Sequence, residues 1–330
     1  MNIAREKLEN QQIWIYGISL LFGGILGIGN EDLGKSLDWA ISPLIALLLY
    51  AMFAQIPFLK LRAALSNLRF MAALLIGNFI AVPILVWILI MIFPQSPPIL
   101  LGVCLVLLTP CIDYVIVFTQ LGKGNEKLML AATPILFVVQ MILLPLYLWL
   151  IIGEEMAEVV HMEPFLEAFL FLIVVPLILA LLTQLWAKKK ALGKKLLDMT
   201  TWFPVPFMAL VLIVVVASQI GKVYSDFGII VRVIPIYILF LIITPLVSKV
   251  IAYVFKLDSG AGRALIFSTG TRNSLVVLPL ALALPNSWAT LAAAVIVTQT
   301  IVELIGELFY IKVIPKWLLK DPTDSMKRFM

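Results

Sequence analysis

The sequence predicts an all-α polytopic membrane protein in which ten transmembrane helices form two inverted five-helix repeats. The chain has 330 residues, of which 62% are hydrophobic and 13% are charged. A soluble domain has nearer half apolar and a quarter charged residues, so this excess is typical of a membrane protein. Apolar runs recur along the whole length, and the loops between them alternate in basic charge. We therefore expect residues 1–330 to form a single membrane domain.

Ten apolar segments are each long enough to cross a bilayer as a helix. Loops on one side of these segments hold twenty Lys and Arg residues, and loops on the other side hold only Lys35, Lys222 and Arg232. Because basic loops stay in the cytoplasm, we expect both termini there, in a plasma (inner) membrane. The N-terminal stretch lacks a small-residue cleavage site, so no removable signal peptide is expected. The segment centres lie near Ser19, Leu48, Pro83, Val106, Gln140, Val175, Val211, Ile242, Val277 and Thr300.

The chain aligns with itself at an offset of about 162, and we call this alignment, which places Pro83 on Pro245, the repeat register. The stretch PLIALLL from Pro43 resembles PFMALVL from Pro206, and FIAVPILV from Phe79 resembles LIITPLVS from Leu241. An odd number of spans in each half means that the second half enters the membrane from the opposite side. This is the plan of many secondary transporters, whereas channels and receptors have less reason for it.

We place the first repeat at 13–152 and the second at 165–314. A cytoplasmic basic linker at 187–200, between the sixth and seventh spans, contains the run KKKALGKK. We interpret this run as a topology signal, with binding of lipid phosphate as the alternative.

The fourth and ninth spans each contain a helix-breaking sequence at equivalent positions. The fourth span holds TPCIDY from Thr109, and the ninth holds STGTRNS from Ser268. Pro110 removes a backbone donor, and Gly270 weakens the ninth helix. Exposed polar backbone is tolerated in a membrane only inside protein or beside a wet cavity. We therefore expect broken helices 4 and 9 to cross near the midplane and to form the transport site.

Charged residues at membrane depth usually face the interior, where they find partners or do work. Asp113 and Arg272 lie in the two broken helices, and the simplest interpretation is an ion pair between them. Such a pair could be structural, or it could act as a gate or proton relay. Both interpretations remain open at this point.

The tenth span carries a polar stripe, because Gln299, Glu303 and Glu307 follow a spacing of four residues. Glu303 has no evident basic partner, and burial of an isolated carboxylate favours proton binding. Glu303 is therefore the preferred proton-coupling residue. Glu307, one turn nearer the cytoplasm, is the second candidate, although Lys312 or Lys316 could extend toward it, which favours a structural role.

Few other features suggest chemistry. Cys104 and Cys111 are seven residues apart, about 10 Å along a continuous helix, which exceeds disulfide reach, so we expect free thiols. His161 lies in an acidic external loop that we interpret as solvated, and no metal site is predicted. No nucleotide-binding loop or nucleophile elbow is present, which argues against an enzyme or an ATP-driven pump, and we expect no cofactor. The expected partners are a small inorganic or organic substrate, protons and the lipid bilayer, without nucleic acid.

The stretch TPCIDYVIVFTQLGKGN, from Thr109, resembles the bile acid:sodium symporter superfamily, in which LGKGN is a common helix-to-loop boundary. Its beginning is similar to the CIAMVIVW-type segment of arsenical-resistance arsenite efflux permeases, a branch of that superfamily. The cysteine that those permeases require matches Cys111, and their tenth-span glutamate matches Glu303. Asn273 fits the asparagine of the broken ninth helix.

The departures from these families are also informative. Sodium-coupled members carry polar residues where this chain has Val115 and Ile116, and a glutamine where it has Arg272. These differences argue against sodium coupling and favour the arsenite branch. Asp113 and Arg272 are not expected of an arsenite permease either, so the resemblance implies a divergent member.

The resemblance and the residues together predict proton-coupled efflux of arsenite, and also of antimonite, because trivalent arsenic prefers thiolate to oxygen ligands. Cys111 would be the thiolate ligand, with Thr109, Arg272 and Asn273 also at the substrate and Glu303 coupling the proton. One alternative is a sodium- or proton-coupled transporter of organic anions, bile-acid-like or small carboxylates, that pair with Arg272. The other is a non-transporting membrane sensor or channel.

Overall fold

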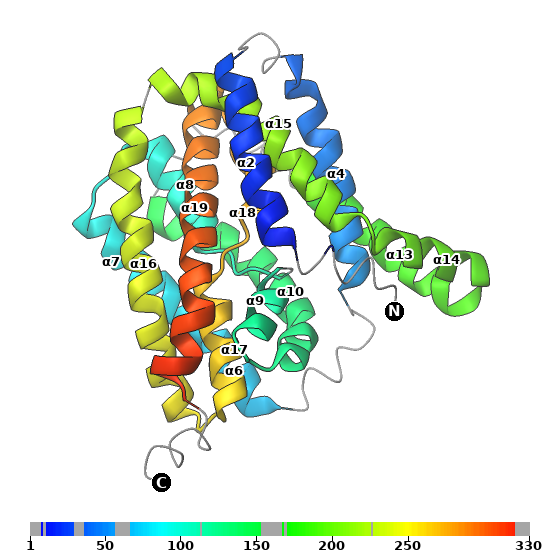
Figure 1. The fold of residues 1–330 in the computed structure, drawn as a ribbon, viewed down its shortest axis with the longest axis vertical. Coiled ribbons are helices and arrows are strands. Elements are labelled where there is room, and N and C mark those ends of the chain that lie inside the picture. Colours follow the sequence, from blue (N-terminus) through cyan, green and yellow to red (C-terminus); the bar gives the residue numbers. More distant parts are fainter. Residues whose placement is uncertain are drawn as a thin grey trace. The chain divides into compact units, whose positions relative to one another are not determined.

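The computed structural model of the chain describes residues 8, 11–29, 36–56, 67–112, 114–152, 167, 170–225 and 227–320. These residues are almost entirely helical (Figure 1), and β-type pairing among them is limited to one isolated bridge. The all-α fold class is therefore confirmed for the described part of the chain. Asp113 and His161, two residues singled out in the sequence, lie outside it.

All ten predicted span centres lie in helices. Short π-helical turns, labelled η, precede or follow some of these helices. In chain order, the elements are α2 (Gln12–Gly29), α4 (Asp38–Gln55), α6 (Leu68–Ile76), η2 (Gly77–Ala81), α7 (Val82–Ile92), α8 (Pro97–Leu107), α9 (Val115–Leu121), α10 (Glu126–Ile152), η3 (Leu170–Val174), α13 (Val175–Lys189), α14 (Ala191–Thr200), α15 (Pro204–Ser225), α16 (Phe227–Val254), α17 (Ser259–Gly270), α18 (Ser274–Leu282), α19 (Asn286–Val313) and η4 (Ile314–Leu318).

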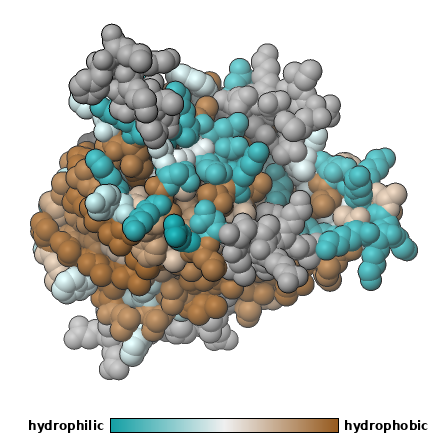
Figure 2. Space-filling view, turned by 90° about the horizontal axis from the view of Figure 1, so that it is seen from below, coloured by the Kyte–Doolittle hydropathy of each residue, from teal (hydrophilic) through white to brown (hydrophobic). Residues whose placement is uncertain are grey.

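Four continuous helical segments in the described residues are long and apolar enough to cross a membrane: Leu68–Ile92, Glu126–Ile151, Val231–Val254 and Trp288–Leu318. The bent pair formed by α14 and α15 adds a fifth candidate, and three shorter apolar helices accompany them. Large apolar side chains are exposed on many helices, and hydrophobic residues cover much of the face in Figure 2. The chain is a membrane protein, and the count of ten spans remains a prediction.

The chain forms two compact units, and each unit combines segments from both predicted repeats. The first unit comprises Met1–Leu59, Glu154–Val231 and Leu275–Val297, and the second comprises Lys60–Gly153, Arg232–Ser274 and Thr298–Met330. The repeats at 13–152 and 165–314 are thus not the compact bodies of the fold.

In the first unit, helices of one half pack against helices of the other half. Helix α2 lies against α15, and α4 lies against α13 and α15. In the repeat register, α2 is equivalent to α13 and α4 to α15, so these contacts are reciprocal, as an internal two-fold relation requires. The side chain of Gln184 on α13 donates to the carbonyls of Phe53, Ala54 and Ile56, which satisfies groups left open where α4 ends.

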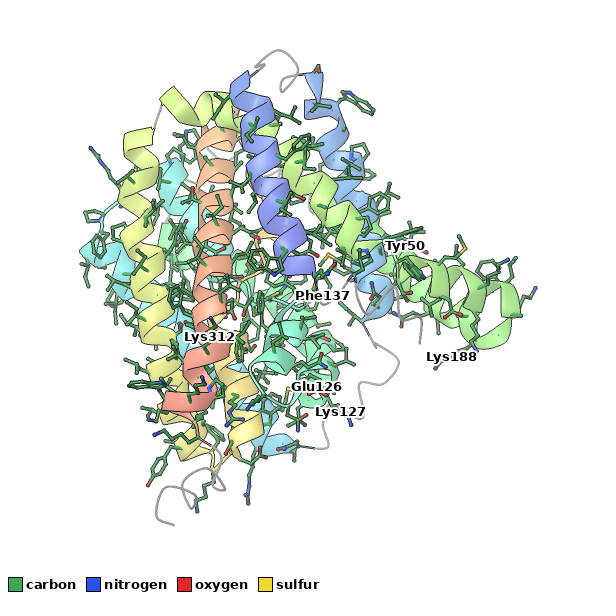
Figure 3. All side chains as sticks on the ribbon, in the orientation of Figure 1. Tyr50, Glu126, Lys127, Phe137, Lys188 and Lys312 are labelled. Carbon is green, nitrogen blue, oxygen red and sulfur yellow. The ribbon has the colours of Figure 1, made fainter. Side chains whose placement is uncertain are left out.

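The predicted basic linker at 187–200 is helical, formed by the end of α13 and by α14. Its lysines are exposed, and Lys188 is labelled at this position in Figure 3. The linker therefore presents its positive charge on the surface of the first unit.

The second unit contains a tyrosine contact that repeats in both halves. A proline cannot donate to the carbonyl four residues before it, so Pro83 frees Phe79 and Pro245 frees Leu241. The hydroxyl of Tyr147 donates to the Phe79 carbonyl. The hydroxyl of Tyr310 likewise donates to the Leu241 carbonyl. The two tyrosines align within one position of each other in the repeat register. In each half, a tyrosine hydroxyl thus satisfies the carbonyl that a proline leaves without its helical donor.

Candidate functional site

Two interruptions in helices meet inside the second unit. The first interruption, residues 108–114, separates α8 from α9, and the second, residues 271–273, separates α17 from α18. Pro110 in the first pairs with Arg272 in the second as an isolated antiparallel bridge. Two segments of broken backbone therefore satisfy one another in the protein interior, where no water is available to do so.

Two main-chain hydrogen bonds close this bridge. Cys111 N–H donates to the Thr271 carbonyl at 3.1 Å, and Asn273 N–H donates to the Thr109 carbonyl at 2.8 Å. Cys111 is equivalent to Asn273, and Thr109 to Thr271, in the repeat register. The repeat register therefore places each of these two hydrogen bonds on the other. All four residues are buried.

The side chains of Thr109 and Thr271 also make equivalent hydrogen bonds. Thr109 Oγ1 donates to the Leu105 carbonyl at 2.7 Å, and Thr271 Oγ1 donates to the Phe267 carbonyl at 2.6 Å. Leu105 and Phe267 are also equivalent in the repeat register. Each hydroxyl satisfies a carbonyl near a helix end, which fixes the side chain beside the bridge.

Cys111 lies at the bridge with a fully buried side chain. Its thiol and that of Cys104, on α8, are both free, so the expected absence of a disulfide between them is confirmed. Cys111 also lies close enough to Arg272 to interact with it electrostatically. The structure thus brings this predicted substrate ligand to the meeting point of the two interruptions.

Glu303, on α19, accepts three hydrogen bonds. The donors are the main-chain N–H of Arg272 at 2.7 Å, the Tyr114 hydroxyl at 2.8 Å and Gln299 Nε2 at 2.5 Å. The expectation of an isolated carboxylate is wrong, because neutral donors surround this side chain. Sequence reasoning missed the contribution of Tyr114, which also lies within 2.9 Å of the Arg272 carbonyl.

Glu307 is fully buried one turn further along α19. Its Oε1 lies 2.9 Å from Thr271 Oγ1, whose one hydrogen has both this oxygen and the Phe267 carbonyl as acceptors, and its second oxygen has no partner among the described residues. The expected lysine is not among its contacts in this part of the chain, although Lys312 lies further along the same helix (Figure 3). Both glutamates therefore contact the second interruption.

The Arg272 guanidinium is buried and turned back toward helix ends. It donates to the carbonyls of Ser268 and Thr269 at 2.6 Å each, to Leu107 at 3.3 Å and to Asn78 Oδ1 at 2.9 Å. It also lies over the Phe240 ring, 5.5 Å from the ring centre. Because Asp113 is outside the described residues, its ion pair with Arg272 remains a prediction.

The described residues contain no group of three or more His, Cys, Asp or Glu side chains that could hold a metal ion. The site instead offers one thiol, one guanidinium and two carboxylates around a rigid backbone bridge. Such a site can bind a small polar or thiophilic solute and can exchange a proton.

Comparison with known proteins agrees with this assignment to transport. The model of the Sodium Bile acid symporter family matches residues 42–226, which is more than half of the chain. No curated protein matches the chain significantly. The matched region includes the first interruption and Cys111, while Arg272 and Glu303 lie beyond it. Members of this family are transporters rather than enzymes. The chain belongs to the sodium bile acid symporter family.

Proposed function

We propose that this transporter exports arsenite, and by the same chemistry antimonite, in exchange for protons. Cys111 would bind the substrate and Glu303 would carry the proton. The observation that best supports this proposal is the short path between these two residues. Cys111 N–H is bonded to Thr271, and the next residue, Arg272, donates its N–H to Glu303. Substrate binding at Cys111 and protonation of Glu303 would therefore both alter the hydrogen bonds of the same backbone bridge.

The proposed substrate chemistry follows from the softness of trivalent arsenic, which prefers sulfur ligands. Arsenous acid would react with the Cys111 thiol by forming a sulfur–arsenic bond. The thiol proton and one hydroxide of the acid leave together as water, so no oxidant or reductant is needed. The neighbouring Thr109 and Asn273 are buried beside the thiol and would contact the remaining hydroxyl groups.

The proposed proton coupling depends on the Tyr114 hydroxyl. It carries one hydrogen but lies near two acceptors, Glu303 Oε1 at 2.8 Å and the Arg272 carbonyl at 2.9 Å. An ionised Glu303 accepts that hydrogen. A protonated Glu303 can instead donate to Tyr114, whose own hydrogen then turns to the Arg272 carbonyl. Protonation of Glu303 is thereby transmitted to the bridge that carries Cys111.

In the proposed cycle, arsenite binds Cys111 from the cytoplasm and leaves on the opposite side, where water breaks the sulfur–arsenic bond and restores the thiol and arsenous acid. Glu303 then takes a proton from outside and releases it inside on the return step. The direction of transport and the cytoplasmic position of both termini are parts of this proposal.

Flux measurements in inside-out membrane vesicles test the proposal. With an acidic vesicle interior, the unmodified protein should accumulate arsenite. Cys111→Ser should reduce uptake by roughly 100-fold, equivalent to about 2.7 kcal/mol of lost ligand binding. Glu303→Gln should abolish accumulation driven by the proton gradient but retain exchange of arsenite for arsenite.

Cys104→Ser is the matched control, because this second buried thiol lies within α8 rather than at the bridge, and its uptake should stay near that of the unmodified protein. Normal arsenite uptake by Cys111→Ser would show that the thiol mechanism is wrong. A protein that never accumulates arsenite against a gradient would favour the sensor or channel interpretation.

A second candidate function is suggested by the name of the family, which points to organic anions and sodium. In that case Arg272 would pair with the substrate carboxylate. Its Nη1 and Nη2 atoms, however, already donate to oxygen atoms of four residues, and only Nε–H is without a partner among the described residues, so a carboxylate could not bind both terminal nitrogens without breaking these bonds. Sodium-stimulated uptake of a bile acid or a small carboxylate, unaffected by Cys111→Ser, would favour this candidate.

A further inference from the structure

The Arg272 guanidinium occupies a shell of oxygen atoms drawn from three segments of the second unit. The carbonyls of Ser268 and Thr269 come from the last turn of α17, and that of Leu107 comes from the last residue of α8. Asn78, in the π-helical turn η2, supplies an amide oxygen. The side chain has no measurable exposure.

Two helix ends contribute negative potential at this shell. The C-terminus of a helix carries roughly half a negative charge, which arises from carbonyls without helical partners. Helices α8 and α17 both end here, so together they contribute about one negative charge. The single positive charge of the guanidinium balances that sum. Without it, these carbonyls would lack a positive partner in the interior of a membrane protein, where unsatisfied backbone groups are costly.

The fourth ligand is fixed independently of Arg272. Asn78 Nδ2 donates to the Leu74 carbonyl at 3.1 Å and to Ser268 Oγ at 3.0 Å. Both bonds hold the amide so that Oδ1 faces the guanidinium. Close packing of η2 on α17 supports this position, since a Cβ on Gly77 would lie 3.0 Å from the Thr269 side chain. The shell is therefore built into the fold, and the arginine is not needed to orient its amide.

Main-chain carbonyls and an amide oxygen, with no carboxylate, are the ligands by which proteins replace the hydration shell of a monovalent cation. We propose that Arg272 is a tethered cation, and that its guanidinium fills a site which would otherwise bind a free monovalent cation such as sodium. A covalently attached charge cannot dissociate, so no ion can be carried through this site during transport. Arg272 would thus influence which ion the transporter uses, because it excludes free monovalent cations such as sodium from this site.

A plain helix cap is the simpler alternative, because Arg272 reaches the carbonyls three and four residues before it. A cap would contact α17 alone, whereas the guanidinium also binds Leu107 and Asn78 in other segments. The two interpretations differ in one consequence. Only a cation site can be refilled by a free cation once the arginine is removed.

Thermal unfolding of the purified full-length protein provides the test. Arg272→Ala and Arg272→Gln are measured in sodium chloride, in N-methylglucamine chloride of equal ionic strength, and with guanidinium added at millimolar concentration. Sodium or guanidinium should raise the midpoint of both variants by about 4 °C relative to N-methylglucamine, which is too bulky for the site. The unmodified protein should show no such difference. Equal midpoints for both variants in all three salts would overturn the proposal.

Two further variants serve as controls. Arg263→Gln removes another buried arginine, which donates to the carbonyls of Lys123 and Leu319, and its midpoint should not respond to sodium. Arg272→Lys keeps the positive charge and should fold without added cation. It can therefore still be measured if the two neutral variants do not fold. If Arg272→Lys responds to sodium as strongly as Arg272→Ala, the tethered charge is not what fills the site.

The transport consequence rests on the proposed function, but the unfolding experiment does not. In vesicles, Arg272→Gln should transport arsenite only when sodium or guanidinium is present. Failure of arsenite uptake by the unmodified protein would refute arsenite transport and leave the cation site untouched. Absence of cation-dependent stabilisation would refute the cation site while arsenite uptake persisted.

Discussion

The two interruptions share a backbone design and differ in charge. In both, a threonine hydroxyl donates to a carbonyl near the end of the preceding helix. In both, a main-chain N–H also donates to a carbonyl of the other interruption, and the donors and acceptors are equivalent in the repeat register. The first interruption carries the thiol of Cys111. The second carries Arg272 and contacts both glutamates of α19.

The origin of this difference is a pair of substitutions at equivalent positions. Arg272 has an N–H, and Glu303 accepts it. Pro110, the equivalent of Arg272, has no N–H to donate. Gln140 aligns within one position of Glu303 in the repeat register, and both polar atoms of its buried side chain lack partners among the described residues. The same backbone geometry thus occurs at both interruptions, whereas Arg272 and Glu303 place the charge at the second one only.

The largest effect on stability is expected at Gly270, where the second interruption begins. A Cβ at this position would lie 2.6 Å from the Tyr310 ring, which is held by the bond of its hydroxyl to Leu241. Because the ring cannot move without breaking that bond, Gly270→Ala should lower the free energy of unfolding by about 3 kcal/mol. Thermal or denaturant unfolding in detergent measures this change.

Gly17→Ala is the control for Gly270→Ala, since nothing lies within 4 Å of a Cβ at Gly17 on α2. Removing a helical glycine there should stabilise the protein by up to about 1 kcal/mol. Equal effects of the two substitutions would mean that contact with Tyr310 is not the reason for glycine at position 270.

A smaller effect is expected when the repeated tyrosine contact is broken in each half. Tyr310→Phe leaves the Leu241 carbonyl unsatisfied in a buried position and should cost about 2 kcal/mol. Tyr147→Phe should cost about 1 kcal/mol, because Tyr147 is only half-buried and water can replace its hydroxyl. Unfolding free energies of both variants provide the comparison. A larger loss for Tyr147→Phe would contradict the role assigned to burial.

The general plan could be predicted because its signals are local or periodic. Proline and glycine weaken a helix wherever they occur, and the helices are interrupted near both Pro110 and Gly270. Apolar segments and the repeat register depend only on composition and spacing. The matched spacing of Tyr147 and Tyr310 was a signal of the same kind, which could have identified the tyrosine contact.

The partners within the site could not be predicted, because they are brought together only by the tertiary fold. Tyr114 and Glu303 are 189 residues apart, and Asn78 and Arg272 are 194 apart. The sequence predicted Asp113, in the other broken helix, as the partner of Arg272, since an opposite charge is the simplest partner for a buried cation. Main-chain carbonyls at helix ends are equally good acceptors, but every residue carries one, so no residue type reveals them.

The smallest effect is expected at Gln140, where the two halves differ most directly. A buried amide without a partner costs free energy, so Gln140→Leu, of similar volume, should stabilise the protein by about 1 kcal/mol. Gln299→Leu should act in the opposite direction, because Gln299 donates to Glu303. Opposite signs in thermal unfolding would show that Gln299 takes part in a polar network and that Gln140 does not. A loss of stability for Gln140→Leu would instead mean that this amide has a partner, and that the first half has a polar network of its own.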